Sequence, residues 1–194
     1  FSLTGSIEMP DSITSIGEYA FYECIYLNGT LKLSNSLNEI KSYAFYKLEK
    51  LSGDLILPDT ITTIEKYAFY DCSSLDGLFK LPESLVTIGY SAFSFCYKLA
   101  GTLNFSDSLM SIEQYAFNKC FGLYGPLNLP VSLKNIGKYA FSECIGLTGT
   151  LRIPDSIEVI ENYTFNKCGN FTSLILGNNL NIIGSYTFYQ CVGL

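Results

Sequence analysis

The sequence contains no histidine among its 194 residues. This absence removes the commonest general base, the usual partner of a nucleophilic serine or cysteine, and the commonest metal ligand. The sequence also lacks a pair of acidic residues repeated at catalytic spacing and a glycine-rich phosphate loop. Together these absences predict that the protein is not an enzyme and that it binds no cofactor and no metal.

Charged residues are also scarce. They make up 15% of the chain, and the net charge is −6 with no basic cluster. Nucleic acid and anionic membrane surfaces are therefore poor partners. No apolar run reaches the roughly 18–20 residues that would cross a bilayer, so we expect no membrane insertion in this segment. The apolar share of 48% nevertheless predicts a folded core.

The sequence is built from a repeated unit of 24 residues, which is clearest between Leu123 and Gly146. A small residue followed by phenylalanine marks every copy, at Ala20-Phe21, Ala44-Phe45, Ala68-Phe69, Ala92-Phe93, Ala116-Phe117, Ala140-Phe141, Thr164-Phe165 and Thr187-Phe188. Eight copies without a linker predict a single repeat array over residues 1–194, in which each copy stacks on the next. The repeats at both ends are cut short, so we expect a fragment of a longer solenoid without its caps.

Each copy has three parts. The alternation L-x-L, as in Leu31 and Leu33, predicts a strand with one buried face. A P-x-S turn then leads into a short second extended segment, as in Leu133–Ile136. In the last part, A-F-x-x-C, the phenylalanine and the cysteine would lie on one side of a single helical or 3-10 turn.

The combined pattern L-x-L-P-x-S-L-x-x-I-x-x-x-A-F-x-x-C resembles the BspA-like (Treponema pallidum-type) leucine-rich repeat of trichomonads, Entamoeba and anaerobic bacteria. The resemblance implies an α/β-type solenoid, with eight stacked coils of about 24 residues. A parallel concave β-sheet would form one side, and short second strands and single helical or 3-10 turns would form the other arc. The resemblance also implies surface association and adhesion to host proteins or other cells.

Several copies depart from this pattern. Leu48 replaces the cysteine, Thr164 and Thr187 replace the alanine, and Ser34, Ser106 and Gly177 replace the proline. All are small or apolar changes, so we expect the coils to remain intact.

The cysteines share one position in the repeat, at Cys24, Cys72, Cys96, Cys120, Cys144, Cys168 and Cys191. Their spacing matches no zinc motif. Stacked neighbours would be close enough for a disulfide, but their Cβ vectors would be parallel. Since Leu48 fills the same position, we interpret the column as buried free thiols that act as small hydrophobic residues.

One candidate binding surface is formed by the residues around and between the strand leucines on the concave face. This strand strip comprises Thr30, Lys32, Asp54, Ile56, Leu78, Lys80, Thr102, Asn104, Pro126, Asn128, Thr150 and Arg152. A varied strip on a regular scaffold suits a binding surface, although a plain solvated sheet would show the same variety.

An alternative binding surface is aromatic. The tyrosine strip comprises Tyr19, Tyr43, Tyr67, Tyr115, Tyr139, Tyr163 and Tyr186, each just before the Ala-Phe or Thr-Phe pair. It could dock a partner, or the rings could simply pack along the outside of the turn with their hydroxyls in water.

Two functions fit these features. The first is a non-catalytic protein–protein interaction scaffold, a segment of an adhesin-like protein at the cell surface or secreted, whose partner is a protein or glycoprotein. The alternative is an intracellular structural repeat protein docked in a larger assembly or associated with its own copies.

Overall fold

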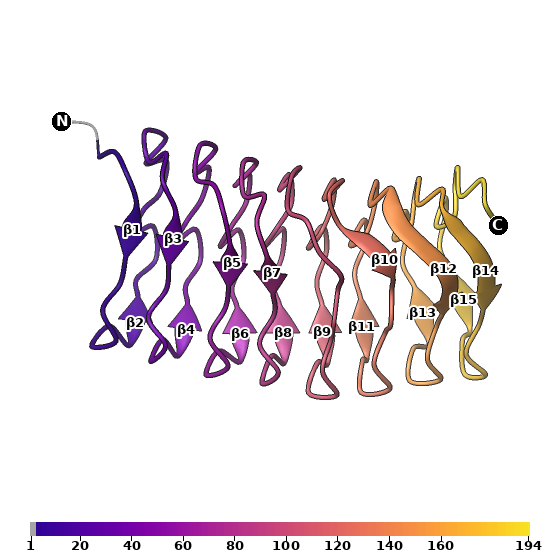
Figure 1. Cartoon of the computed structure of the whole chain (residues 1–194). Coiled ribbons are helices and arrows are strands. Elements are labelled where there is room, and N and C mark those ends of the chain that lie inside the picture. Colours follow the sequence, from indigo (N-terminus) through magenta and orange to yellow (C-terminus); the bar gives the residue numbers. More distant parts are fainter. Residues whose placement is uncertain (1–2) are drawn as a thin grey trace.

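The computed structural model describes residues 3–194 as a row of coils, with the two chain termini at opposite ends of the row (Figure 1). We number the coils 1 to 8 by the phenylalanine that each contributes, from Phe21 to Phe188. Each coil runs through a first strand, a turn, a second strand and a second turn. The predicted leucine-rich-repeat solenoid is thereby confirmed.

The strands are short and pair in parallel, with partners one coil apart, such as Ile7 and Leu31. The first strands are β1 (Ile7–Glu8), β3 (Leu31–Lys32), β5 (Leu55–Ile56), β7 (Phe79–Lys80), β10 (Tyr124–Pro126), β12 (Gly146–Arg152) and β14 (Phe171–Ile175). The second strands are β2 (Ser15–Ile16), β4 (Glu39–Ile40), β6 (Thr63–Ile64), β8 (Thr87–Ile88), β9 (Ser111–Ile112), β11 (Asn135–Ile136), β13 (Val159–Ile160) and β15 (Ile182–Ile183).

The two strand ladders differ in continuity. The second strands from β2 to β11 form one six-stranded sheet, and β13 pairs with β15. The first strands form three separate sheets, β1-β3, β5-β7 and β10-β12-β14, rather than the single sheet that we expected. Coil 5 contributes no first strand, because the chain between β7 and β10 makes only isolated bridges on this side.

The prediction of a helical or 3-10 turn over A-F-x-x-C is wrong, and residues 3–194 contain no helix. Tyr19 and Glu23 have φ angles of 59° and 52°, and the same pair of left-handed residues recurs in all eight coils. A left-handed residue interrupts a right-handed helix. The segment is therefore a series of tight turns, and the fold is a β-solenoid rather than an α/β-type one.

Backbone donors in this turn alternate between two kinds of acceptor. The N–H groups of Ala20, Tyr22 and Cys24 donate to carbonyls three residues earlier in the same coil. The N–H groups of Tyr19, Phe21 and Glu23 donate to the next coil at 2.9–3.2 Å. We call these coil-to-coil bonds the turn ladder. The same three bonds recur at every junction from coil 1 to coil 8, so the turn ladder is more continuous than either strand ladder.

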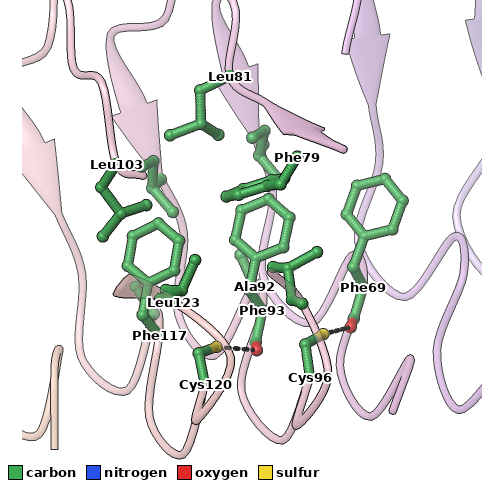
Figure 2. Packing of buried hydrophobic residues seen from close by; sticks show 14 of the residues in the cluster. Phe69, Phe79, Leu81, Ala92, Phe93, Cys96, Leu103, Phe117, Cys120 and Leu123 are labelled. Carbon is green, nitrogen blue, oxygen red and sulfur yellow. Dashed lines mark hydrogen bonds between the residues drawn. The ribbon is translucent and has the colours of Figure 1, made fainter. Parts of the chain in front are cut away.

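The phenylalanines form the centre of the core. Adjacent rings stack with centroids 5.0–5.8 Å apart, along a column made of Phe21, Phe45, Phe69, Phe93, Phe117, Phe141, Phe165 and Phe188. The rings from Phe45 to Phe165 are fully buried. Figure 2 shows Phe69, Phe93 and Phe117 in a row, with Phe79 of β7 and Leu103 of coil 5 above. The predicted continuous core is therefore present.

The departures from the repeat are accommodated as expected. Leu48 is fully buried in the position that cysteine occupies elsewhere. The buried hydroxyl of Thr164 donates to the carbonyl of Glu161 at 2.8 Å. The turn that proline opens in other coils is kept at Ser106, whose carbonyl accepts from Leu109 N–H at 3.2 Å.

Truncating a ring in the middle of the phenylalanine column should be costly. Phe117→Ala removes a fully buried ring that stacks on both neighbours, so we expect it to lower the free energy of unfolding by about 3–5 kcal/mol. Urea denaturation followed by circular dichroism measures the change. Lys80→Ala on the exposed strip should stay within about 0.5 kcal/mol of the parent. Equal stability of Phe117→Ala and the parent would show that the stacking register is wrong.

Candidate functional site

The strand strip lies on one face of the solenoid. All of its residues are exposed except Thr150, which is half-buried. The alternation of the strands produces this arrangement, since Lys32 points outward between the buried Leu31 and Leu33. The structure thus brings the predicted residues together on one surface, and a binding role for them stays a prediction.

The strand strip is chemically mixed. It exposes the apolar side chains of Ile56 and Leu78, by 47% and 59% of their areas. The Lys80 ammonium lies 3.5 Å from the carboxylate of Asp59, so this cation is partly neutralised. Apolar groups beside a few charges and amides are the composition of an ordinary protein interface.

A groove crosses the strand strip where β7 faces the irregular segment 102–107 of coil 5. Two adjoining hollows, of about 480 and 440 Å³, share Phe79, Lys80, Thr102 and Asn104 as lining residues. We call them together the central groove. Each hollow falls within the range of small-ligand sites, about 300–1,000 Å³.

Two phenylalanines line the groove. Phe79 and Phe105 occupy strand core positions at which the neighbouring coils carry leucine or isoleucine. Phe79 packs edge-on against Phe93 with ring centroids 5.3 Å apart, while Phe105 leans toward Phe117, 6.2 Å away. Larger side chains in a close-packed core force the backbone to shift. We infer that this bulk widens the groove between coils 4 and 5. It does not explain the lost strand pairing, which is also absent between β3 and β5, where the core residues are leucines.

The backbone hydrogen bonds reflect the same separation. Leu55 and Leu57 N–H donate to the carbonyls of Leu78 and Lys80 at 2.8 and 3.1 Å, which joins coil 3 to coil 4. Within residues 3–194, no corresponding bond joins Leu81 N–H to coil 5, and none joins Leu33 N–H to coil 3. The second strands β8 and β9, which do not line the groove, still pair and keep coils 4 and 5 joined on their own side.

The tyrosine strip is a stacked column. Successive rings from Tyr19 to Tyr67 and from Tyr115 to Tyr186 lie 4.6–4.9 Å apart. Ser91 interrupts the column, and Tyr90 bridges the gap by contacting Tyr67 and Tyr115. Because the rings cover one another's faces, the strip presents mainly ring edges and hydroxyls.

Coils 1 to 3 carry a second tyrosine column beside the first. Tyr22, Tyr46 and Tyr70 stack at 4.9 Å and meet the first column edge-on. In coils 4 to 7 the equivalent positions hold Ser94, Asn118, Ser142 and Asn166, which are buried. The aromatic surface is therefore concentrated in the first three coils, a difference that our sequence analysis did not identify.

The cysteine column contains free thiols, and those from Cys72 to Cys191 are buried. Each of these thiols donates to the carbonyl of the phenylalanine in the preceding coil, such as Cys96 Sγ to Phe69 O at 3.0 Å (Figure 2). Burial raises the pKa of the Cys72 thiol to about 12. The thiols are thus structural hydrogen-bond donors as well as small apolar groups, and they are poor nucleophiles.

Two further features bear on function. No group of histidine, cysteine, aspartate or glutamate side chains in the described part of the chain could hold a metal ion. No helix in residues 3–194 is long and apolar enough to cross a membrane.

The repeat is found in known proteins. The sequence profile of the BspA type Leucine rich repeat region matches residues 2–124 and 123–194, with six copies. A leucine rich cell surface protein from Faecalibacterium prausnitzii A2-165 is 27% identical over 93% of this chain, with a TM-score of 0.67. The T. pallidum leucine rich repeat protein is 28% identical over 97% of the chain, with a TM-score of 0.61. No curated protein matches the chain.

The chain spans part of the length of these relatives. It covers 56% of the Faecalibacterium protein and 77% of the T. pallidum protein. A leucine-rich repeat protein from Eubacterium ventriosum ATCC 27560, 18% identical with a TM-score of 0.57, shares the fold.

Replacing both groove phenylalanines should close the central groove. Because leucine is smaller than phenylalanine, coils 4 and 5 should approach in the double variant Phe79→Leu/Phe105→Leu and cover Leu81 N–H more fully. Hydrogen–deuterium exchange at Leu81 should slow relative to the parent. Phe93→Leu, in the phenylalanine column, should weaken the fold without protecting Leu81. Unchanged exchange at Leu81 in the double variant would contradict our explanation of the groove.

The buried thiols should destabilise the fold at alkaline pH. Burial raises the pKa of Cys72, Cys96, Cys120, Cys144, Cys168 and Cys191 above the ordinary value. Unfolded thiols ionise near pH 8.5 while the folded ones stay protonated, so stability is complete below that pH and falls above it. The expected slope is about 1.4 kcal/mol per pH unit for each thiol.

Urea denaturation at a series of pH values from neutral to alkaline measures this slope. Cys120→Ala should flatten it by the share of one thiol, whereas Lys80→Ala should leave it unchanged. A slope that is the same in Cys120→Ala and the parent would show that this thiol does not contribute.

Proposed function

This chain belongs to the BspA-type leucine-rich repeat family, and from that premise we propose that it is a non-catalytic protein–protein interaction scaffold. The observation that carries the proposal is the strand strip, a varied and exposed surface held on an otherwise repetitive core. A rigid repeat frame with a variable face suits recognition of a large partner.

We further propose that the chain is a segment of an adhesin-like protein, at the cell surface or secreted, that binds a host or cell-surface protein or glycoprotein. The Faecalibacterium relative is described as a cell surface protein, which supports this location. In this proposal, the repeat array over residues 1–194 is one part of a longer solenoid.

The tyrosines favour a second candidate function. The six stacked rings of coils 1 to 3, from Tyr19 to Tyr70, form an aromatic patch on the turn side, in which Tyr19 and Tyr22 are exposed and the other four are half-buried. Tyrosine is enriched in the energetic centres of protein interfaces. This patch would serve an intracellular structural repeat protein that docks in a larger assembly or on its own copies.

Binding of chain-coated fluorescent beads to epithelial cell monolayers tests the proposal. The strip variant Lys32→Ser/Ile56→Ser/Arg152→Ser removes three exposed side chains outside the central groove. If each contributes to the interface, binding should fall about tenfold or more, the equivalent of about 1.4 kcal/mol. The control variant Val131→Ser changes an exposed side chain, 76% accessible, outside both strips, and should bind like the parent.

The turn-side variant Tyr19→Asn/Tyr22→Ser separates the two candidate functions. Asparagine tolerates the left-handed conformation at position 19, so the fold should be kept. Loss of binding in this variant alone would replace the strand strip with the tyrosine patch as the docking surface. Beads coated with the parent chain that bind no better than bare beads would contradict the adhesin proposal.

A further inference from the structure

The central groove is a hollow in the middle of the array rather than at an end, and it lies at one of the two gaps between the first-strand sheets. The first strands lose their pairing there, while the second strands and the turn ladder continue through coils 4 and 5. A hollow between coils that stay joined elsewhere is a pre-formed site, which costs little to reorganise on binding.

One of the two hollows of the groove, the one that Tyr124 lines, places apolar surface next to this tyrosine. Leu78 and Tyr124 both line this hollow and expose 59% and 55% of their areas. Tyrosine carries a ring face with partial negative charge beside a polar hydroxyl. Such a ring suits the C–H face of a sugar, whose hydrogens carry partial positive charge.

The middle of the groove offers hydrogen-bonding groups side by side. Asn104 Nδ2 donates to Thr102 Oγ1 at 3.1 Å. This bond fixes the amide and leaves the Asn104 carbonyl oxygen as an acceptor and the Thr102 hydroxyl proton as a donor. The Thr102 hydroxyl and the Asn104 carbonyl oxygen thus offer a donor and an acceptor on neighbouring side chains. They match the neighbouring hydroxyls of a sugar ring, each of which both donates and accepts.

The other hollow of the groove, which Glu83 and Asp107 line, disfavours anions. Neither carboxylate forms a salt bridge among the described residues. Lys80 also lines the groove, and its ammonium is partly neutralised by Asp59. Carboxylates accept hydrogen bonds from uncharged hydroxyls but repel sulfate, phosphate and sialic acid groups.

We propose that the central groove binds a neutral oligosaccharide, with Tyr124 and Leu78 against one sugar face and Thr102 and Asn104 bonded to its hydroxyls. The mixed lining favours a sugar over an apolar side chain of a protein partner, which would leave these polar groups unpaired. The site goes beyond the proposed protein-binding function, because the rest of the strand strip could hold a protein whether or not the groove holds a sugar.

Titration of the isotope-labelled chain by nuclear magnetic resonance tests the proposal. The neutral probes are lactose, N,N′-diacetylchitobiose and mannobiose, and the acidic probes are 3′-sialyllactose and a heparin disaccharide. Probe concentrations of about 10 mM would nearly saturate a complex with a Kd of about 1 mM. We expect at least one neutral probe to shift the amide resonances of residues 78–80 and 102–104 saturably, and the acidic probes to bind more weakly.

Matched variants locate the sugar. Tyr124→Ala and Asn104→Ala should each weaken binding about 3- to 10-fold, the loss of one packing or hydrogen-bonding contact. Phe79→Leu/Phe105→Leu keeps every polar side chain and should abolish binding if it closes the groove, a closure that exchange at Leu81 reports independently. Tyr19→Asn, on the opposite turn, should bind like the parent.

Three results would overturn the sugar proposal. One is the absence of saturable shifts with every neutral probe. Another is tighter binding of the acidic probes. The third is loss of bead adhesion in Tyr124→Ala without any sugar binding by the parent, which would make the groove a protein contact. None of these results touches the proposed scaffold function, which fails only if the beads do not bind or the strip variant binds like the parent.

Discussion

The turn ladder is the constraint on which the rest of the structure depends. At each junction three backbone donors, such as Tyr19, Phe21 and Glu23 N–H, bond to the next coil, and the pattern never breaks from coil 1 to coil 8. These bonds fix the spacing between coils on the turn side. The phenylalanines stack at 5.0–5.8 Å because they are attached to this ladder. The strand ladders can open locally, as between β7 and coil 5, without the solenoid coming apart.

The ladder requires conformations that side chains other than glycine seldom adopt. Two residues in each coil are left-handed, and in seven of the eight coils the first of them is tyrosine. A left-handed residue costs roughly 1–2 kcal/mol. Three coil-to-coil hydrogen bonds, each worth about 0.5–1.5 kcal/mol, together with ring stacking, offset that cost. The column of tyrosines is therefore explained by stacking at a strained turn before any role in binding is invoked.

The sequence allowed the solenoid, the number of repeats, the buried positions and the exposed strand strip to be predicted, because each follows from a period of 24 residues. It did not allow the turn to be predicted. Phenylalanine and cysteine three residues apart fit a helical turn, and only the backbone angles at Tyr19 and Glu23 exclude one. The thiol bonds to phenylalanine carbonyls, such as Cys96 to Phe69, were also missed, because they join residues 27 positions apart in different coils. The central groove had a visible signal in Phe79 and Phe105, but both residues still read as ordinary core positions.

In a repeat protein the information about partners resides in departures from the repeat. The phenylalanines, thiols and turn donors recur because stacking requires them, so they would be the same whatever the chain binds. Phe79 and Phe105 differ, since each stands where the neighbouring coils carry a smaller leucine or isoleucine. Overpacking of this kind normally reduces stability. Between coils 4 and 5 the hydrogen bonds of the turn ladder and of the β8–β9 pair hold the coils together. The first strands can therefore separate there and leave a hollow lined by varied polar groups. The continuity of the turn ladder is what allows the first strands to separate locally while the coils stay joined.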